Sequence, residues 1–370
     1  MAGFLPQLGL QPVTGSAFSI ARYKIKPAFF DDFCRHTIRQ MQEVISTRYW
    51  KGYRLYAGDG TTISVPVSKD TVAHFGTFAQ TESGTKTVMA SACMIYDVLS
   101  NYVVDAKIGG MENSEFTLLQ NMLEGTTLDD NGILILDRGF SKFYFYKVLI
   151  NKGIRFCIRQ RTGCHDFSEQ VLNCPEDDFI TEWYPSEAER ATCRHKGIEP
   201  SSIKVRVTKI ALSSGETELL ITNLFDQQQI TPEDLKELYH FRWSIEEAFK
   251  QLKPQMKLEQ FGCKKANGVY QEFYAHIIML NITTLIAHLA EPHIEQQTQG
   301  RKYQYKYNRV NAWKFVRNKI IDLYAIKQNV KLVIELVGQI RGSVIAIVPN
   351  RSFPRDHRFK RKNRLSPMYK

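Results

Sequence analysis

The sequence predicts an α/β protein in which a β-rich insertion interrupts the core and the C-terminal part is helical. The first supporting observation is the order of the expected elements up to about residue 158, which is strand, strand, strand, helix, strand, helix, strand. The second is that residues 160–226 are rich in polar and turn residues and end in an expected hairpin. The third is that helical patterns fill most of residues 231–340.

The first half of the chain alternates helical and extended patterns. A helix is predicted over residues 28–47, because apolar side chains recur there at helical spacing. Residues 133–136 are aliphatic throughout, which is typical of a strand buried on both faces of a sheet. The other expected elements of this half are extended runs at 54–57, 61–65, 86–98, 102–108 and 154–158 and helices at about 113–123 and 141–151.

The second half contains a hairpin followed by helices. Residues 203–212 and 216–224 have the composition of two strands joined by a Ser-Ser-Gly turn. One long helix is predicted over residues 231–253, because it opens with Thr-Pro-Glu-Asp, in which Thr can cap the helix and Pro suits its first turn. Three more helical patterns fill residues 268–340.

The charge of the chain is concentrated near its C-terminus. The 370 residues are 43% hydrophobic and 24% charged, a balance that excludes a wholly disordered or collagen-like chain, and their net charge is +11. Residues 301–320 hold seven basic side chains and no acidic one, and residues 350–370 hold eight basic side chains and one acidic one. Aromatic residues interleave with these charges, which favours binding to nucleic acid. The alternative is a solubilising surface with a disordered tail.

The cysteines and the most apolar segment indicate the compartment. Seven cysteines and no recognisable signal peptide favour reduced thiols in a cytoplasm. The pairs Cys164-His165 and Cys193-x-His195 have a loose spacing that makes a zinc site improbable. Residues 273–290 lack charge for about the length of a membrane span, but they include polar side chains such as Asn281. We therefore expect a buried core helix there and no membrane association.

Two aspartates follow expected strands. Asp59 closes an extended run and lies between Gly58 and Gly60, and Asp137 follows the aliphatic run at 133–136. Since ligands of α/β proteins gather at the carboxyl ends of strands, we predict that both carboxylates lie at one edge of the sheet. The alternative for either residue alone is a turn aspartate that bonds to the local backbone.

The helix predicted at 231–253 carries a patterned polar face. Tyr239, Arg242, Glu246 and Lys253 are separated by three, four and seven residues, which stacks them along one side of an α-helix. This face presents a carboxylate between two cations and a tyrosine. The alternative is a solvated helix on which Arg242 and Glu246 form an ordinary ion pair.

These residues resemble the Y-R-E-K signature of bacterial insertion-sequence transposases, the DDE group of the insertion-sequence-four type. The match is Tyr239-x2-Arg242-x3-Glu246-x6-Lys253, and Asp59-Gly-Thr61 and Asp137-Arg-Gly-Phe140 look like the sites of the first and second aspartates of that family. The resemblance covers roughly residues 15–365. It implies a ribonuclease-H-like core, a mixed five-stranded sheet with helices on both sides, and a β-rich insertion between the second Asp and the Glu.

The resemblance also implies a chemistry. Asp59, Asp137 and Glu246 would be the catalytic, metal-binding triad for two Mg²⁺, which Mn²⁺ could replace, because two divalent ions can activate the nucleophile and stabilise the leaving oxygen of a phosphodiester. Water would cut the ends of the element, and the freed 3′-OH would then join target DNA. Tyr239 and the two cations Arg242 and Lys253 would be the DNA-binding residues, contacting phosphates.

The implied partners are double-stranded DNA, as terminal inverted repeats and as target, and a second copy of the chain in a homodimeric synaptic complex. The implied location is the bacterial cytoplasm, in association with the nucleoid. Another ribonuclease-H-like nuclease is a further possibility, but it leaves the Y-R-E-K signature unexplained. Within the insertion, Trp183 would either stack on a displaced base or pack in the core. Glu112 and Glu115 begin an expected helix and are left outside the site, because acidic residues are common there.

With this resemblance the chain divides into five expected segments. These are an N-terminal helical remnant at 1–48, the first part of the catalytic core at 49–159, the insertion at 160–226, the helical second part of the core at 227–345, and a basic tail at 346–370. Family members usually carry an N-terminal domain that recognises the transposon ends, whereas 58 residues precede Asp59 here. We therefore expect a shortened copy, and the alternative function is an inactive or truncated transposase-derived DNA-binding protein.

Overall fold

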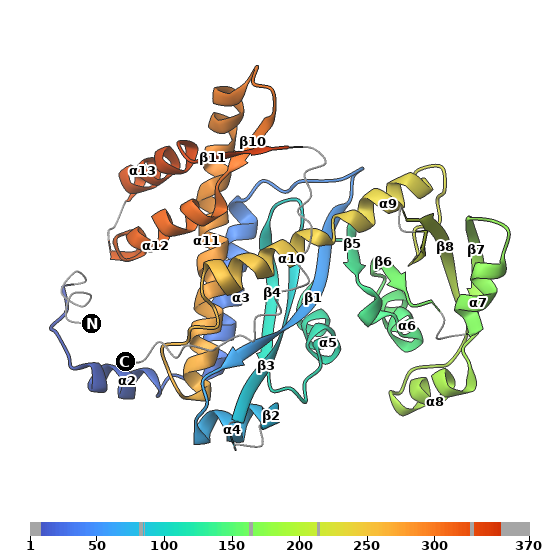
Figure 1. The fold of residues 1–370 in the computed structure, drawn as a ribbon, viewed down its shortest axis with the longest axis horizontal. Helices are drawn as coiled ribbons and strands as arrows, with labels where there is room; N and C mark the ends of the chain where they lie inside the picture. Colours follow the sequence, from blue (N-terminus) through green and yellow to red (C-terminus); the bar gives the residue numbers. More distant parts are fainter. Residues whose placement is uncertain are drawn as a thin grey trace. The chain divides into compact units, whose positions relative to one another are not determined.

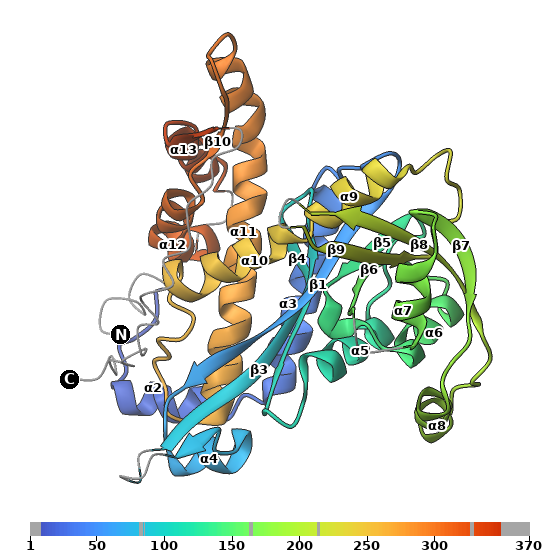
Figure 2. The same ribbon diagram turned by 45° about the vertical axis from the view of Figure 1, so that its right-hand side comes forward.

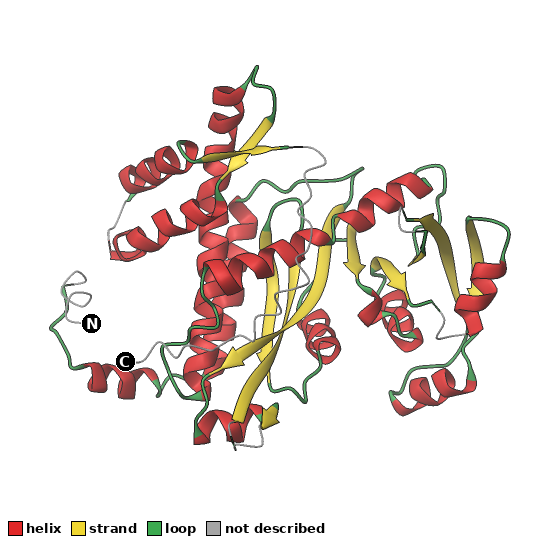
Figure 3. Cartoon of the chain, viewed as in Figure 1, coloured by secondary structure: helices red, strands yellow, loops and turns green. Residues whose placement is uncertain are grey.

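The computed structural model describes residues 9–80, 84, 86–162, 166–212, 215–325 and 329–348 (Figure 1). Both helices and strands occur among these residues, as Figure 3 shows. Their contacts form two compact units, which we describe in turn. Within the described residues, one unit draws on Met1–Ile45, Thr62–Ala90 and Phe249–Lys370, and the other on Ser46–Thr61 and Ser91–Ala248.

Most of the described strands belong to one mixed sheet. In chain order they are β1 (Arg54–Val65), β2 (Ala79–Gln80), β3 (Lys86–Asp97), β4 (Tyr102–Gly109), β5 (Gly132–Leu136), β6 (Arg155–Gln160), β7 (Asp178–Trp183), β8 (Ile203–Ala211) and β9 (Thr217–Thr222). The hydrogen-bonded order is β2-β3-β1-β5-β6-β9-β8-β7, and β4 pairs with β3 outside this path. β1, β5 and β6 are parallel, and β9, β8 and β7 continue antiparallel from β6.

The middle of the sheet is fully buried. In β5 the four aliphatic residues from Ile133 to Leu136 have no exposed surface, which confirms the prediction of a strand covered on both faces. Burying an Ile or Leu side chain contributes about 1.5–3 kcal/mol relative to leaving it exposed. Asp137 therefore directly follows a strand that is fixed by packing on both faces.

Helices cover both sides of this part of the sheet. Figure 2 shows α5 (Glu115–Gly125) and α6 (Phe143–Asn151) on one side of β1, β5 and β6, and α9 (Pro232–His240) on the other. Two further helices, α7 (Asp166–Asn173) and α8 (Glu187–His195), belong to the insertion. The prediction of a mixed α/β architecture is confirmed.

The sheet is wider than the five strands expected from the resemblance. The difference arises at β6, whose outer edge pairs with β9 from Cys157↔Thr222 to Gln160↔Leu219. Because an open strand edge offers unpaired backbone groups, the hairpin of the insertion adds to this edge and does not form a separate sheet. The insertion strands thus extend the core sheet.

The helix predicted over residues 231–253 is interrupted. It consists of α9, α10 (Trp243–Lys250) and a π-helical turn, η2 (Gln251–Gln255). At the first break the Arg242 N–H donates to the Tyr239 carbonyl at 3.1 Å, a bond between residues three apart that tightens the turn. The predicted start is confirmed, since the Thr231 side chain caps α9. The prediction of a single uninterrupted helix is wrong.

The other unit is built around a long helix, α11 (Ala266–Thr298). The N-terminal helices α2 (Gly15–Arg22) and α3 (Pro27–Val44) belong to this unit, as does α4 (Lys69–Phe75), and α3 packs along α11. By length and composition α11 alone among the described helices is apolar enough to cross a membrane. However, 61% of its most apolar window is buried, and Asn281 has no exposed surface, so α11 is a core helix as predicted.

The end of α11 forms a second core with the C-terminal elements. These are β10 (Gln304–Tyr307), α12 (Arg309–Ala325), α13 (Val330–Arg341) and β11 (Val344–Ile347), and β10 pairs antiparallel with β11. Ile294 on α11, Val316 on α12 and Leu336 on α13 are among the buried residues of this core. The two compact units do not correspond to the five segments expected from the sequence, so that division of the chain stays a prediction.

Candidate active site

The two predicted aspartates lie side by side where the parallel pairing of β1 with β5 ends. Asp137 directly follows β5, whereas β1 continues through Asp59 to Val65, so the prediction that Asp59 closes an extended run is wrong. Gly58 of β1 pairs with Leu136 of β5, and Asp59 and Asp137 are the next residues on the two strands. The Asp59 Oδ1 accepts a hydrogen bond from the Gly60 N–H at 2.8 Å. The Asp137 Oδ1 accepts one from the Gly139 N–H at 2.8 Å, where the chain turns into a short 3-10 helix, η1 (Arg138–Phe140). The β-sheet register therefore brings these two carboxylates together.

The glycines around Asp59 allow α5 to pack closely on β1. A Cβ atom at Gly58 would lie 2.6 Å from the Leu136 Cδ2 and 3.2 Å from the Leu119 Cδ1. A Cβ atom at Gly60 would collide with the side chain of Glu115. Glu115 at the start of α5 is therefore in contact with the backbone next to Asp59.

Asp59 is the most perturbed carboxyl of this site. The pKa of Asp59 is raised to about 7, mainly by burial and in addition by the nearby Asp137 and Glu115. The Gly60 N–H and the Arg242 guanidinium act in the opposite direction. Like charges close together disfavour ionisation, and such perturbed groups cluster at functional sites. Sequence reasoning omitted Glu115, because its position at a helix start has an ordinary explanation.

Glu246 is held by Arg242. The Arg242 Nη2 lies 2.8 Å from the Glu246 Oε1, and the two side chains are 10% and 27% exposed. The guanidinium carbon of Arg242 is 5.6 Å from the ring centre of Tyr239 and 5.2 Å from that of Trp243. The ion pair of the alternative interpretation is thus present, but it is largely buried and its arginine interacts electrostatically with Asp59, so the helix is not a plain solvated one.

Two further features of this cluster concern its polar atoms. The Nε of Arg242 is buried without a hydrogen-bond partner in the described residues. Burial raises the pKa of Tyr239 far above its ordinary value, and Arg242 partly counteracts this effect. The phenol is therefore a neutral hydrogen-bonding group at any physiological pH.

Lys253 falls in the other compact unit. Its Nζ donates to the Thr62 carbonyl at 2.5 Å and lies 3.9 Å from the Glu259 Oε1. The π-helical turn that contains Lys253 has a different angular spacing from an α-helix. The predicted stacking of four residues along one α-helix is therefore wrong, and the cluster around Arg242 contains three of them.

The carboxylates of Asp59, Asp137 and Glu246 have the chemistry of ligands for a divalent metal ion. Asp59 and Asp137 are also neighbours across the sheet. Carboxylate oxygens are the ligands that Mg²⁺ prefers, and a cation between Asp59 and Asp137 would relieve the repulsion that raises the pKa of Asp59. Among the described residues, however, no three His, Cys, Asp or Glu side chains are gathered as metal ligands. To complete a triad, Glu246 would exchange Arg242 for the metal.

Trp183, at the end of β7, packs between Phe167 of α7 and the helix α6. It is 2% exposed and stacks on Phe167 with ring centres 4.1 Å apart and planes 3° from parallel. The rings of Phe143 and Tyr146 lie within 5.4 Å of it. Of the two interpretations of Trp183, the structure supports the packing one.

The loosely spaced Cys and His pairs do not assemble a zinc site in the described part of the chain. Cys193 is buried in α8, and no metal-binding group includes it. Cys164 and His165 lie outside the described residues.

The basic residues near the C-terminus are accompanied by aromatic rings, as the sequence indicated. The Arg317 guanidinium lies 4.6 Å from the ring centre of Trp313, and that of Arg301 lies 5.1 Å from Tyr305. Lys314 and Arg317 are exposed on α12. Most of the predicted basic tail, from residue 349 onward, lies outside the described residues.

Comparison with known proteins assigns the family. Residues 50–282, more than half of the chain, match the family model described as the transposase DDE domain. The chain is 24% identical over 240 residues to the transposase InsG for insertion sequence element IS4 from Escherichia coli strain K12, and the match covers 63% of this chain. It spans 52% of the length of that relative.

A solved structure is also similar. It is a cryo-EM structure of a piggyBac transposase synaptic complex with hairpin DNA, with a TM-score of 0.42, 10% identity, and coverage of 81% of this chain and 59% of the other. The family assignment depends on the matched domain, which contains all the residues singled out from the sequence as its site, from Asp59 to Lys253. The chain belongs to the transposases with a DDE domain.

Proposed function

We propose that this protein is a DNA transposase of an insertion sequence, with a ribonuclease-H-like core and the insertion-sequence-four arrangement of site residues. It would hydrolyse phosphodiesters at the ends of the element and join the 3′-OH to target DNA. The observation that carries the proposal is that Asp59 and Asp137 are neighbours where the pairing of β1 with β5 ends, with Arg242 acting on Asp59 and paired to Glu246.

Asp59, Asp137 and Glu246 are proposed to hold two Mg²⁺, or Mn²⁺ in their place. When bound, such ions activate water or a 3′-OH as the nucleophile and stabilise the leaving oxygen. The contribution of the chain is to place two carboxylates on buried, parallel strands that cannot shift independently. Because burial raises the pKa of Asp59 to about 7, proton release from this carboxyl would accompany metal binding.

Arg242 is proposed to bind first Glu246 and then a DNA phosphate. Before metal and DNA bind, it neutralises Glu246 at 2.8 Å. When Glu246 turns to a metal, the guanidinium becomes available to a DNA phosphate, for which its planar donors are suited. Tyr239 and Lys253 are proposed to contact neighbouring phosphates. The partners are the terminal inverted repeats, the target DNA and a second copy of the chain in a homodimer, in the cytoplasm and at the nucleoid of a bacterium.

The test uses a plasmid that carries the gene with its flanking DNA. We expect Asp59→Asn, Asp137→Asn and Glu246→Gln each to abolish strand cleavage in Mg²⁺ while leaving duplex binding unchanged in EDTA. Glu247→Gln is the matched control, because Glu247 is exposed and next in sequence. Cleavage by the Glu246→Gln protein at the rate of the unmodified protein would refute the assignment.

The second candidate is a DNA-binding protein without catalytic activity. It is favoured by the engagement of Glu246 with Arg242. Titration of Mn²⁺ into the DNA-bound protein, followed by electron paramagnetic resonance, distinguishes the two. Tight uptake that is lost in Asp137→Asn supports the enzyme, and unchanged free Mn²⁺ supports the inactive protein.

A further inference from the structure

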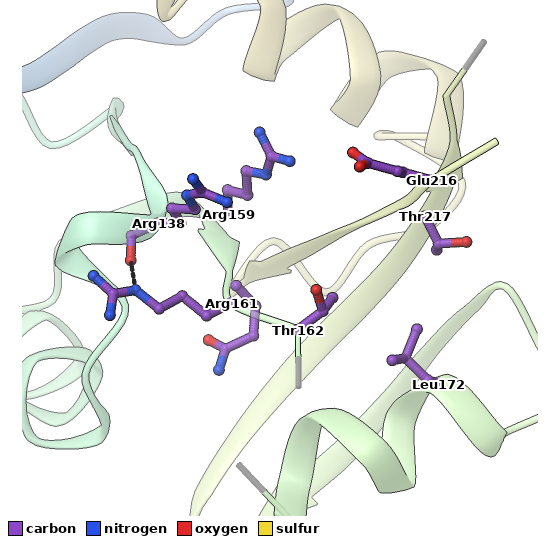
Figure 4. Close-up of a pocket in the computed structure, with 8 residues that line it drawn as sticks. Arg138, Arg159, Arg161, Thr162, Leu172, Glu216 and Thr217 are labelled. Carbon is purple, nitrogen blue, oxygen red and sulfur yellow. Dashed lines mark hydrogen bonds between the residues drawn. The ribbon is translucent and has the colours of Figure 1, made fainter. Parts of the chain in front are cut away.

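A cavity lined by arginines opens next to the second aspartate. It has a volume of about 580 Å³ and lies between η1, the end of β6 and the start of β9. Figure 4 shows Arg138, Arg159 and Arg161 on one side and Glu216 and Thr217 on the opposite side. Arg138 directly follows Asp137, so the cavity begins one residue from the proposed metal site.

The arginines of the cavity are fixed in different ways. Arg159 Nε lies 3.0 Å from the Glu218 Oε1, and this side chain is 30% exposed. Arg161 Nε donates to the Arg138 carbonyl at 3.2 Å, which ties the loop after β6 to η1. Both Arg138 and Arg161 are exposed. One arginine is thus matched to a carboxylate, while the other two present their guanidinium groups to solvent.

The surroundings of the cavity add further positive charge. Burial lowers the pKa of Lys142, and Arg161 and Lys196 lower it further. The ammonium group of Lys142 also lies 4.5 Å from the ring centre of Phe116. An anion placed among these groups would relieve their mutual repulsion, because opposite charges favour the charged form of each.

The chemistry of the lining selects a phosphate over a base. None of the described residues that line the cavity is aromatic, so a nucleobase would find no ring on which to stack. Guanidinium groups, in contrast, match the oxygens of a phosphate in a bidentate way. We propose that this cavity binds a backbone phosphate of the DNA strand that passes Asp137, through Arg138 and Arg161. DNA as the ligand rests on the proposed function.

The cavity is also linked to the segment of α9 and α10 that carries Tyr239, Arg242 and Glu246. Burial raises the pKa of Glu218, while Arg159 and Arg242 both lower it, so this one carboxylate of β9 is within electrostatic reach of both arginines. Glu218 thus interacts electrostatically both with an arginine of the cavity, Arg159, and with Arg242. A strand whose phosphate occupies the cavity would be positioned relative to Asp137 by the core sheet itself.

The first test maps the arginines directly. The full-length protein is treated with phenylglyoxal in EDTA, with and without a 30-base-pair duplex, and modified peptides are identified by mass spectrometry. We expect the duplex to protect Arg138 and Arg161 at least about fivefold. Arg194 is the internal control, because it is 59% exposed and paired with Glu187 on α8. Equal reactivity of Arg138 and Arg161 with and without DNA would overturn the proposal.

The second test measures the contribution of charge. Arg161→Gln and Arg138→Gln should each weaken duplex binding about tenfold at low salt and reduce the slope of log Kd against log salt by about one, since each phosphate contact contributes about 0.9. Arg155→Gln is the matched control, because Arg155 lies at the opposite end of β6. A loss equal to that of Arg155→Gln would overturn the assignment, and the thermal midpoint of each variant verifies folding.

Three further outcomes separate the alternatives. A duplex with methylphosphonate linkages in one strand should lose protection, and full protection by this neutral backbone would refute a phosphate ligand. Protection by an RNA duplex and not by DNA would refute DNA as the partner. Protection by DNA without strand cleavage in Mg²⁺ would uphold the cavity and refute the proposed enzyme, so the two proposals fail separately.

Discussion

A buried ion pair connects the insertion to the start of α9, and its removal is expected to destabilise strongly the unit that contains Ser46–Thr61 and Ser91–Ala248. Arg206 on β8 has no exposed surface. Its Nε and Nη2 each lie 2.8 Å from an oxygen of Asp178, and its Nη1 donates to the Ile230 carbonyl at 2.8 Å. Ile230 immediately precedes the Thr231 cap of α9. The pair therefore positions the helix that carries Tyr239.

The magnitude follows from this geometry. Asp178→Asn preserves the shape of the side chain but leaves the buried Arg206 charge without its counter-ion, which costs about 3–5 kcal/mol. For a unit of this size we expect the thermal midpoint to fall by about 6–20 °C. Glu187→Gln is the control, because its pair with Arg194 is exposed at both ends and contributes about 0–1 kcal/mol. Equal midpoints for the two variants, measured by circular dichroism, would refute the reasoning.

The same pair predicts a dependence on pH. Burial alone would raise the pKa of Asp178, but hydrogen bonds from Arg206, Thr208 and Gln227 outweigh it and lower the pKa. A lowered folded-state pKa means that the stabilisation is fully present above the unfolded pKa of about 3.9 and is lost as the pH falls through the folded value. The difference in stability between the unmodified protein and Asp178→Asn should therefore shrink on acidification below about pH 4. A constant difference down to pH 2 would contradict this.

Three further predictions concern the site and the charged regions. Glu115→Gln should lower the pKa of Asp59 from about 7, since one repelling charge is removed, and carbon-13 NMR of the Asp59 carboxyl would report an unchanged value if Glu115 has no influence. Gly58→Ala should lower the free energy of unfolding by about 1–3 kcal/mol, because its Cβ would lie 2.6 Å from the Leu136 Cδ2. An unchanged free energy of unfolding in urea denaturation would contradict this. Deletion of residues 350–370 should weaken duplex binding and flatten its salt dependence, because eight basic residues are removed, and an unchanged slope would assign that segment to solubility.

The placement of the two aspartates could be predicted because it depends on local order. An aliphatic run indicates a buried strand, and parallel strands end at the same edge of a sheet. The residues that follow the paired runs 54–58 and 132–136 therefore meet, although the continuation of β1 through Asp59 to Val65 was not predicted. Glu115 could not be predicted in the same way, since its contact with Gly60 depends on how α5 packs across β1.

The division between sequence and structure follows the range of the interactions. The sequence by itself determined which strands precede Asp59 and Asp137, where α9 begins, and that Arg242 and Glu246 can pair four residues apart, because each depends on neighbours within a few residues. Only the tertiary structure decided that the insertion extends the core sheet and that Trp183 is packed. It also brought together the arginines of the cavity from two segments. These features depend on strand edges, ring packing and charges that meet only when distant segments fold together.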